Sequence, residues 1–240
     1  MRSPSCFVHP KGLCESTKVG EGTRVWAFAH VLDGAVVGRD CNICDHAFIE
    51  GGAVLGDRVT VKNAVLIWDR VTVEDDVFLG PNMIFTNDFT PRAHVKKSRD
   101  ELLPTVVRRG ATIGANATIV CGVTLGEHAF VAAGTTVTRD VAAHAIVRGC
   151  PGRAVGWACA CGLPLPEELS CRCGDRYELV DGKLSRRGLA PAVFHHELAV
   201  QLGGTVDLGV PQRRRGHVGP SGDGETAAEL AVVDQPGDRR

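Results

Sequence analysis

The chain has 240 residues and a formal net charge of −1 at pH 7, so it is long enough for one sizeable domain and a small appendage. The near-neutral charge and the absence of a Lys/Arg block from the repeat described below argue against a nucleic-acid-binding protein. No apolar run approaches the length that spans a bilayer, and the N-terminal segment lacks the apolar core and cleavage site of a signal peptide. We therefore predict a cytoplasmic protein that binds neither nucleic acid nor membranes.

An aliphatic or aromatic anchor recurs at every sixth position from Val19 to Phe85, and a short or moderate side chain follows most anchors four residues later. A period of six fits neither an amphipathic helix nor a simple half-buried strand. Hexapeptide repeats are typical of a parallel β-helix, in which three hexads form one triangular coil of about 18 residues. Three glycines spaced 18 residues apart favour the β-helix, because each would occupy the same corner of successive coils: Gly20, Gly38 and Gly56.

We predict an all-β fold, a left-handed parallel β-helix over residues 8–157, and a β-sandwich is the alternative. The register extends back through Leu13 and Thr17, so the first partial coil is expected to begin near residue 8. Turn-forming residues such as Pro151 end the β-helix.

The register breaks after Phe85, because the distance along the chain to the next anchor, Val107, is not a multiple of six. The polar segment 86–106 is therefore predicted to be a loop that projects from the coil. Such a long irregular loop is uncommon in a compact repeat unless it is functional, although a tolerated surface insertion is the alternative.

Seven of the ten cysteines fall into two groups. Within the repeat, Cys41, Cys44 and Cys121 are expected to pack as small, reduced side chains. Only the second group has the spacing of metal ligands, and it lies in a predicted appendage over residues 158–184: Cys159, Cys161, Cys171 and Cys173. The segment YELVDGKL in this appendage could form a hairpin, because an Asp-Gly pair favours a tight turn. The aperiodic remainder, 185–240, is predicted to be a flexible tail.

Three motifs within the repeat are more distinctive than the hexads: NICDHAFIE, IWDRVTVEDDVFLGPN and FTNDFTPR. Together with the later PTVVRRGATIGANATIVCG and RGCPGRAVGW, they resemble the hexapeptide-repeat N-acetyltransferases that act on nucleotide-linked 3-amino sugars. The resemblance implies an enzyme that uses acetyl-CoA to acylate the 3-amino group of a dTDP-3-amino-3,6-dideoxyhexose. A UDP-3-amino-uronate N-acetyltransferase, or another hexapeptide O- or N-acyltransferase, is the alternative within the class.

The same resemblance implies a homotrimer whose active sites lie in clefts between neighbouring β-helices. A single coil is too narrow to enclose both CoA and a nucleotide sugar, and the loop could supply part of the wall. Burial between subunits would also explain three outward-facing aromatic residues: Trp26, Phe28 and Trp68.

The reaction is attack of a sugar amine on a thioester, so the site must hold a neutral amine near the carbonyl. In the resembling enzymes the Asn of the FTN motif contacts the amino group, no side-chain base is used, and the departing CoA sulfur takes up the proton. That role carries over to Asn87, whose amide can orient the amine but does not titrate. Asp88 could instead serve as a base, or could stabilise a turn of the loop.

Histidine catalysis is the rival mechanism, and His46 and His30 lie just outside the anchors. We predict that His46 contacts the substrate and is not a catalytic base, although a solvent-facing or interface histidine is the plainer alternative. The full set of predicted substrate contacts is His46, Asp88, Arg92, Glu50 and His30.

CoA is expected to run along the later coils, where small side chains leave room for its narrow pantetheine arm: Gly114, Ala115, Ala132, Ala133 and Gly134. Arg139 and Arg153 could pair with its phosphates. The family usually has Asn before the Pro of the GCPGR segment, and here the residue is Cys150.

Four thiolates can close a structural zinc site, and the cysteine cluster resembles a zinc-ribbon-like appendage of some family members. The second pair is one residue shorter than the familiar knuckle, so free thiols or a disulfide remain the alternative. Outside the acyltransferases, a γ-carbonic-anhydrase-like metalloenzyme is a further candidate, but His30, His46 and His128 do not show the spacing that it requires. A non-catalytic scaffold is the third class.

Overall fold

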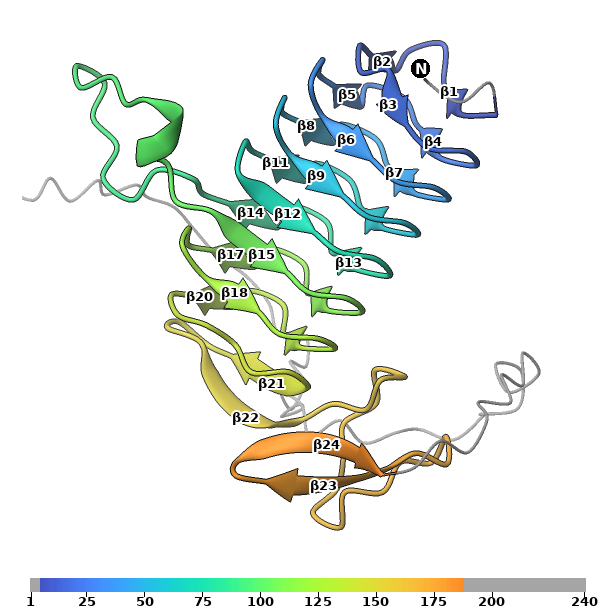
Figure 1. The fold of residues 1–240 in the computed structure, drawn as a ribbon, viewed down its shortest axis with the longest axis vertical. Helices are drawn as coiled ribbons and strands as arrows, with labels where there is room; N and C mark the ends of the chain where they lie inside the picture. Colours follow the sequence, from blue (N-terminus) through green and yellow to red (C-terminus); the bar gives the residue numbers. More distant parts are fainter. Residues whose placement is uncertain (1–4, 188–240) are drawn as a thin grey trace, which may run out of the picture. The chain divides into compact units, whose positions relative to one another are not determined.

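The computed structural model describes residues 5–187, whose secondary structure consists almost entirely of short β-strands. The strands follow one another in coils, and the coils stack so that their strands form three sheets, called A, B and C below (Figure 1). The prediction of an all-β, left-handed parallel β-helix with a projecting loop and a small Cys-rich appendage is confirmed. Of the predicted tail, only residues 185–187 are described. No helix within residues 5–187 is long and apolar enough to cross a membrane.

Sheet A contains β1 (Phe7–Val8), β4 (Arg24–Val25), β7 (Asn42–Ile43), β10 (Thr60–Val61), β13 (Phe78–Leu79), β16 (Thr112–Ile113), β19 (Phe130–Val131), β21 (Ala145–Arg148) and β22 (Arg153–Trp157). Sheet B contains β2 (Leu13–Cys14), β5 (His30–Val31), β8 (Phe48–Ile49), β11 (Leu66–Ile67), β14 (Ile84–Phe85), β17 (Thr118–Ile119) and β20 (Thr136–Val137). Sheet C contains β3 (Lys18–Val19), β6 (Val36–Val37), β9 (Val54–Leu55), β12 (Val71–Val73), β15 (Thr105–Val107) and β18 (Thr124–Leu125). A 3-10 helix, η1 (Arg99–Glu101), lies in the loop, and β23 (Arg176–Val180) and β24 (Lys183–Arg187) form a hairpin.

The hexad anchors form the core of the β-helix. Every anchor from Val19 to Phe85 and from Val107 to Val137 is at most 3% exposed. Burying each such side chain contributes about 1.5–3 kcal/mol, but only after neighbouring coils have stacked on it. Cys41 fits this core as predicted, since its side chain is inaccessible and burial raises the pKa of its thiol to about 11.

The projecting loop interrupts the repeat without changing the strand pairing. Val61 pairs with Leu79 one ordinary coil later, whereas Leu79 pairs with Ile113 on the far side of the loop. The chain therefore takes almost twice the length of an ordinary coil to return to sheet A, and the excess is the loop. Strand β15 already begins at Thr105, whose N–H donates to the carbonyl of Arg70 at 3.0 Å, so the projecting segment is 86–104 and ends slightly before the predicted limit.

The register predicted for the first coil is wrong. Leu13 is 51% exposed, and the inward residue of β2 is Cys14, which is 8% exposed. Cys14 pairs with Val31, and Val31 pairs with Ile49, so the first of these coils is one residue shorter than the second. A shift of one residue along a strand moves a side chain to the opposite face, which is why Leu13 points outwards.

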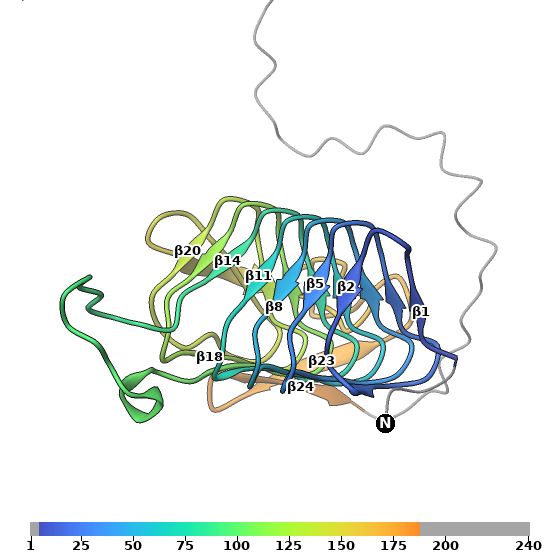
Figure 2. The same ribbon diagram turned by 90° about the horizontal axis from the view of Figure 1, so that it is seen from above.

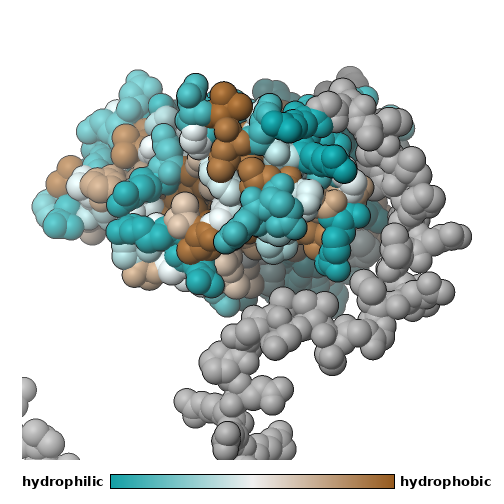
Figure 3. Space-filling model, turned by 90° about the horizontal axis from the view of Figure 1, so that it is seen from below, coloured by the Kyte–Doolittle hydropathy of each residue, from teal (hydrophilic) through white to brown (hydrophobic). Residues whose placement is uncertain are grey.

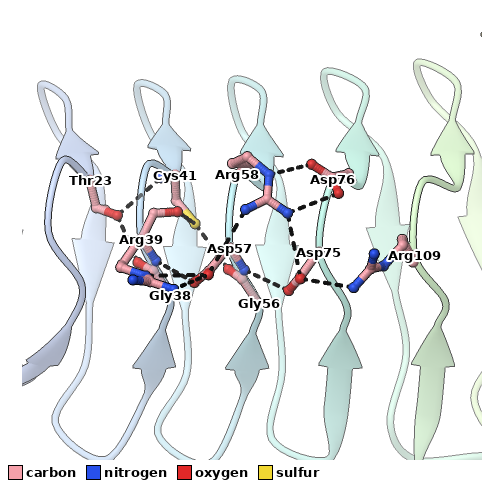
Figure 4. A network of polar contacts seen from close by, with 10 residues as sticks. All are labelled: Thr23, Gly38, Arg39, Cys41, Gly56, Asp57, Arg58, Asp75, Asp76 and Arg109. Atoms are coloured by element: carbon pink, nitrogen blue, oxygen red, sulfur yellow. Dashed lines mark hydrogen bonds and ion pairs between the residues drawn. The ribbon is translucent and has the colours of Figure 1, made fainter. Parts of the chain in front are cut away.

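Successive coils approach closely at the corner between sheets C and A. A Cβ added to Gly38 would lie 2.4 Å from the carbonyl oxygen of Gly56 in the next coil. Asp57 supports this corner, since its Oδ1 accepts the Arg39 N–H at 2.8 Å (Figure 4). Asp75 accepts the Asp57 N–H in the same way at 2.9 Å, so side chains one coil apart repeat the same contact.

We expect Gly38→Ala to lower the free energy of unfolding by about 1–3 kcal/mol, because the new methyl group must displace backbone of the next coil. Gly156→Ala is the matched control, since a Cβ there would meet nothing within 4 Å, and its effect should stay within about 0.5 kcal/mol. Urea denaturation of both variants makes the comparison. Equal effects would contradict the close packing at this corner.

Candidate active site

The strands of sheet B lie in a row, and the loop projects from the coils beside them (Figure 2). The outer face of this sheet carries a largely apolar column of side chains. One outward residue from each of five successive strands forms this column: Leu13, His30, Phe48, Leu66 and Ile84. Trp68 packs beside it, with its ring centroid 5.7 Å from that of Phe48 and its Nε1 donating to the carbonyl of Phe85 at 2.8 Å. Leu13 and Ile84 are about half exposed, so this face resembles a surface that a partner or ligand covers.

Two predicted substrate contacts, His30 and Glu50, and the predicted catalytic residue, Asn87, lie in or beside this column. His30 lies within it, and its Nε2 is 3.2 Å from Oε1 of Glu15. Glu50 follows β8 directly at the corner between sheets B and C, where its carboxylate accepts the Asp69 N–H at 2.7 Å. Asn87 is half-buried at the same corner two coils later, at the base of the loop. The fold thus places these residues along one side of the β-helix, with three coils between the levels of His30 and Asn87.

His46 lies at the opposite edge of sheet B, at the corner with sheet A. Its ring is exposed and stacks on Phe28 with centroids 5.0 Å apart. Its φ of 61° is shared by Ala64 and Asn82, at 57° each, in the same column of corner residues. The left-handed conformation therefore belongs to the architecture of the corner, and it is not evidence of a function for His46.

Asp88 is held inside the loop. Its Oδ1 forms an ion pair with Nζ of Lys97 and accepts the Thr90 N–H at 2.9 Å. The Lys97 ammonium holds the pKa of this carboxyl below its usual value. Because a lower pKa makes a weaker base, this arrangement favours the turn-stabilising role of Asp88 over general-base catalysis. Arg92 is exposed further out in the loop, where its guanidinium donates to the carbonyl of Pro91 at 3.0 Å.

A second ion pair fastens the loop to the β-helix. Arg99 donates to both carboxylate oxygens of Asp69, at 2.6 and 2.9 Å, and thereby holds the pKa of Asp69 below its usual value. The preceding coil leaves space for this carboxylate, since a Cβ on Gly52 would lie 2.2 Å from Oδ1 of Asp69. Leu103 N–H also donates to the carbonyl of Asn87 at 2.9 Å, which closes the base of the loop. These contacts determine where Asn87 lies.

Sequence reasoning missed Asp69, Arg99 and Lys97 as residues that position the loop. Their partners are 30 positions away for Arg99 and nine for Lys97, so no local spacing marks the pairs. The only available signal was the number of charged residues in the segment.

The small residues predicted for CoA gather at the corner between sheets A and B on two successive coils. Gly114 is packed so closely that a Cβ would lie 2.5 Å from the Ala133 N, whereas a Cβ on Gly134 would meet nothing within 4 Å. Ala115 accepts the Gly134 N–H at 2.8 Å. Gly114 therefore permits the coils to stack, while Ala133 and Gly134 leave the outer surface of this corner exposed.

The two predicted phosphate-binding arginines lie at different edges of sheet B. The turn before Arg153 lies against β20, because Gly152 N–H donates to the carbonyl of Thr136 at 2.7 Å, so Arg153 follows the turn beside the small residues. Arg139 is exposed after β20, at the corner with sheet C. Within one chain, Arg153 is thus better placed than Arg139 to meet a ligand at the corner of sheets A and B.

The histidines of the carbonic-anhydrase alternative are dispersed within one chain. His30 lies on sheet B and His46 at the corner of sheets A and B, whereas His128 lies at the corner of sheets C and A. The ring of His128 lies tilted against that of His144, with centroids 5.0 Å apart, and burial lowers the pKa of both rings. Among residues 5–187, the metal-ligand cluster is formed instead by the four cysteines.

The coiled fold and its hexads define a hexapeptide-repeat transferase. The bacterial transferase hexapeptide family (six repeats) matches residues 16–51 and 104–139. The chain is 47% identical over 187 residues to dTDP-3-amino-3,6-dideoxy-alpha-D-galactopyranose 3-N-acetyltransferase from Aneurinibacillus thermoaerophilus, covering 77% of this chain and 96% of that enzyme. The chain belongs to the hexapeptide-repeat N-acetyltransferase family that includes this enzyme.

Two solved structures are also similar. One is a hexapeptide-repeat acetyltransferase from Vibrio cholerae in complex with acetyl-CoA, with a TM-score of 0.43 and 24% identity, covering 52% of this chain and 70% of that chain. The other is the acetyltransferase domain of PglB from Neisseria gonorrhoeae in complex with acetyl-CoA, with a TM-score of 0.41 and 17% identity, covering 63% and 55% respectively.

We expect Asp69→Asn to increase amide hydrogen exchange within 86–104 about two- to fivefold, the effect of losing an ion pair worth roughly 0.5–1 kcal/mol. Because the pKa of Asp69 is lowered from 3.8, its contribution is present above that value and is lost as the pH falls through the lowered pKa. The difference from wild type should therefore vanish in acid. Asp100→Asn is the control, since Asp100 is 97% exposed and lies 3.6 Å from Arg70. An equal increase in that variant would count against the Asp69–Arg99 contact.

Proposed function

We propose that this protein transfers the acetyl group of acetyl-CoA to the 3-amino group of a dTDP-3-amino-3,6-dideoxyhexose. The observation that carries the proposal is the 47% identity that extends over 96% of a 3-N-acetyltransferase of this substrate class. The identity covers more than the hexads, because 187 aligned residues exceed the repeat itself. The local similarity to the generic hexapeptide transferases would not by itself distinguish N- from O-acylation.

In the proposed reaction, the neutral sugar amine attacks the thioester carbonyl and the thiolate of CoA departs. Asn87 orients the amine, and the proton leaves with the CoA sulfur. The ion pair with Lys97 supports this assignment, because it leaves Asp88, the carboxylate next to Asn87, poorly suited to accept a proton. Positioning then provides most of the catalysis.

The two substrates approach from the two edges of sheet B. The nucleotide sugar lies across the apolar column, where His30, Glu50 and Arg92 contact it, and it extends to His46 at the corner of sheets A and B. CoA lies along the corner of sheets A and B, beside Gly114 and the small residues stacked on it, with Arg153 nearest its phosphates. The supporting observation is that these two sets of residues border one continuous face.

The partly exposed column on sheet B also supports a homotrimer, because an apolar face of this kind is often covered by a partner. The site would then lie in the cleft between neighbouring β-helices, where the loop of one chain reaches the other. We place the enzyme in the cytoplasm, where acetyl-CoA and nucleotide sugars are available.

Asn87→Ala should lower kcat/KM by about 10², the effect expected when positioning of the nucleophile is lost. His46→Ala should mainly raise KM for the nucleotide sugar, because a contact removed equally from substrate and transition state leaves kcat nearly unchanged. Steady-state release of CoA thiol, measured with a dTDP- and a UDP-linked 3-amino sugar, provides both numbers. A fall of about 10² in kcat for His46→Ala with an unaltered KM would show instead that a histidine is the base.

Leu66→Asp should convert the trimer to smaller species and abolish most activity, because it places a charge in the centre of the apolar column. Val54→Asp is the matched control, since Val54 also points outwards from a central strand but lies on sheet C and is 38% exposed. Light scattering and thiol-release assays on both variants make the test. A wild-type protein that is fully active as a monomer would refute the shared site.

A further inference from the structure

We propose that Cys159, Cys161, Cys171 and Cys173 bind one Zn²⁺ ion, and that this metal holds residues 158–187 as a cap on the last coil of the β-helix. The four Sγ atoms all lie within 4.8 Å of one another, and the closest pairs are 3.5 Å apart. A tetrahedral zinc with Zn–S bonds of about 2.3 Å requires sulfur atoms about 3.8 Å apart. Four cysteines arranged in this way bring their sulfur atoms close to the separation that the metal requires.

The two cysteine pairs lie on equivalent turns. In each turn the glycine that follows the second cysteine donates its N–H to the carbonyl of the first, Gly162 to Cys159 at 2.8 Å and Gly174 to Cys171 at 2.9 Å. Both glycines have a left-handed φ, of 89° and 100°. The first cysteine of each turn also donates its N–H to a carbonyl just beyond the turn, at 2.8 Å in both. The short spacing is therefore a repeated turn that directs two thiols to one point.

Polar side chains next to the cluster make the sulfur of Cys159 suitable as a metal ligand. The hydroxyl oxygen of Tyr177 accepts the Ala160 N–H at 2.9 Å, which leaves its O–H to donate to Sγ of Cys159 at 3.3 Å. A sulfur that accepts a hydrogen bond is suited to be a metal-bound thiolate. Asp175 lies 3.6 Å from the same sulfur, and its negative charge is offset by an ion pair with Arg186.

The appendage needs such a cross-link because its own core is small. Its hydrophobic cluster contains three buried residues, Cys159, Tyr177 and Leu184, and Trp157 and a few partly buried residues pack against them. A segment of this size rarely folds on hydrophobic burial alone. The hairpin contributes a tight Asp-Gly turn, with Asp181 and Gly182 at φ of 50° and 71°, which confirms the turn predicted from the sequence.

The cluster is connected directly to the last coil. Ala158, next to the first cysteine, donates to the carbonyl of His144 at 2.7 Å and accepts from Nδ1 of the same histidine at 2.9 Å. Tyr177 packs edge-on against that ring, with centroids 5.2 Å apart. Trp157 contacts both the β-helix core and the appendage core. Ordering of the cysteines therefore orders β21 and β22.

A cap is required at this position, because the last coil of a solenoid has no further coil to cover its core. Strand β22 already departs from the parallel pattern and pairs with β21 antiparallel. Viewed from the end that carries the hairpin, the described residues show hydrophobic surface only in separate patches between hydrophilic ones (Figure 3). The appendage thus replaces the missing coil.

The test uses the full-length chain, purified without an affinity tag under reducing conditions. We expect about one zinc per chain by mass spectrometry and four sulfur neighbours at about 2.3 Å by X-ray absorption. Cys171→Ser should retain less than a tenth of the metal, whereas Cys150→Ser, an exposed cysteine outside the cluster, should retain all of it. Tyr177→Phe should keep the stoichiometry but bind zinc about tenfold more weakly in competition with a chelator.

Removal of the metal from the wild-type chain tests the cap and avoids variants that fail to fold. Hydrogen exchange should accelerate at least tenfold in 141–158 after chelation, while exchange in the central coils, 42–67, stays unchanged. Two disulfides in place of the metal, found by mass spectrometry of the intact protein, would overturn the zinc site. Stoichiometric zinc whose removal leaves exchange in 141–158 unaltered would overturn the cap.

Discussion

The spacing between coils, set by backbone hydrogen bonds of about 2.9 Å, is the constraint on which the structure depends. It brings equivalent positions of successive coils to about 4.8 Å from one another, so residues that are one coil apart in the chain become neighbours in a column. The position of a column decides what it requires. Inward columns need apolar side chains, and columns at the corners need small ones. Columns on the outer faces tolerate many residue types. The outer column on sheet B and the small residues at its edge are two uses of that freedom.

Most of the β-helix could be predicted because this constraint leaves a period in the sequence. The buried anchors from Val19 to Val137 confirm it. The break after Phe85 could also be predicted, because Val107 lies outside the six-residue series that Phe85 ends. Strand pairing resumes beyond the loop. The register of the first coil was not predicted correctly, because Leu13 and Cys14 are both apolar. Which of the two points inwards depends on this coil being one residue shorter than the next.

The candidate site could be predicted only in part, for a physical reason. Distinctive local motifs led to the predictions for Asn87 and His46, and composition led to the prediction for the corner of small residues. The ion pair of Asp69 with Arg99 joins side chains from a coil and from an irregular loop, whose path no period describes. In the same way, the spacing of the four cysteines indicated metal ligands. The equivalence of their two turns depends on backbone geometry that cannot be inferred from the amino-acid sequence.

The position of the loop has a consequence for how such proteins diversify. It leaves the coil after β14 and returns at β15 with all three sheets in their earlier register, so the stacked core does not depend on its length. The entropic cost of a longer loop grows only with the logarithm of its length. A corner of a β-helix is therefore a place where insertions, deletions or exchanged segments can alter what the surface recognises while the scaffold is inherited intact.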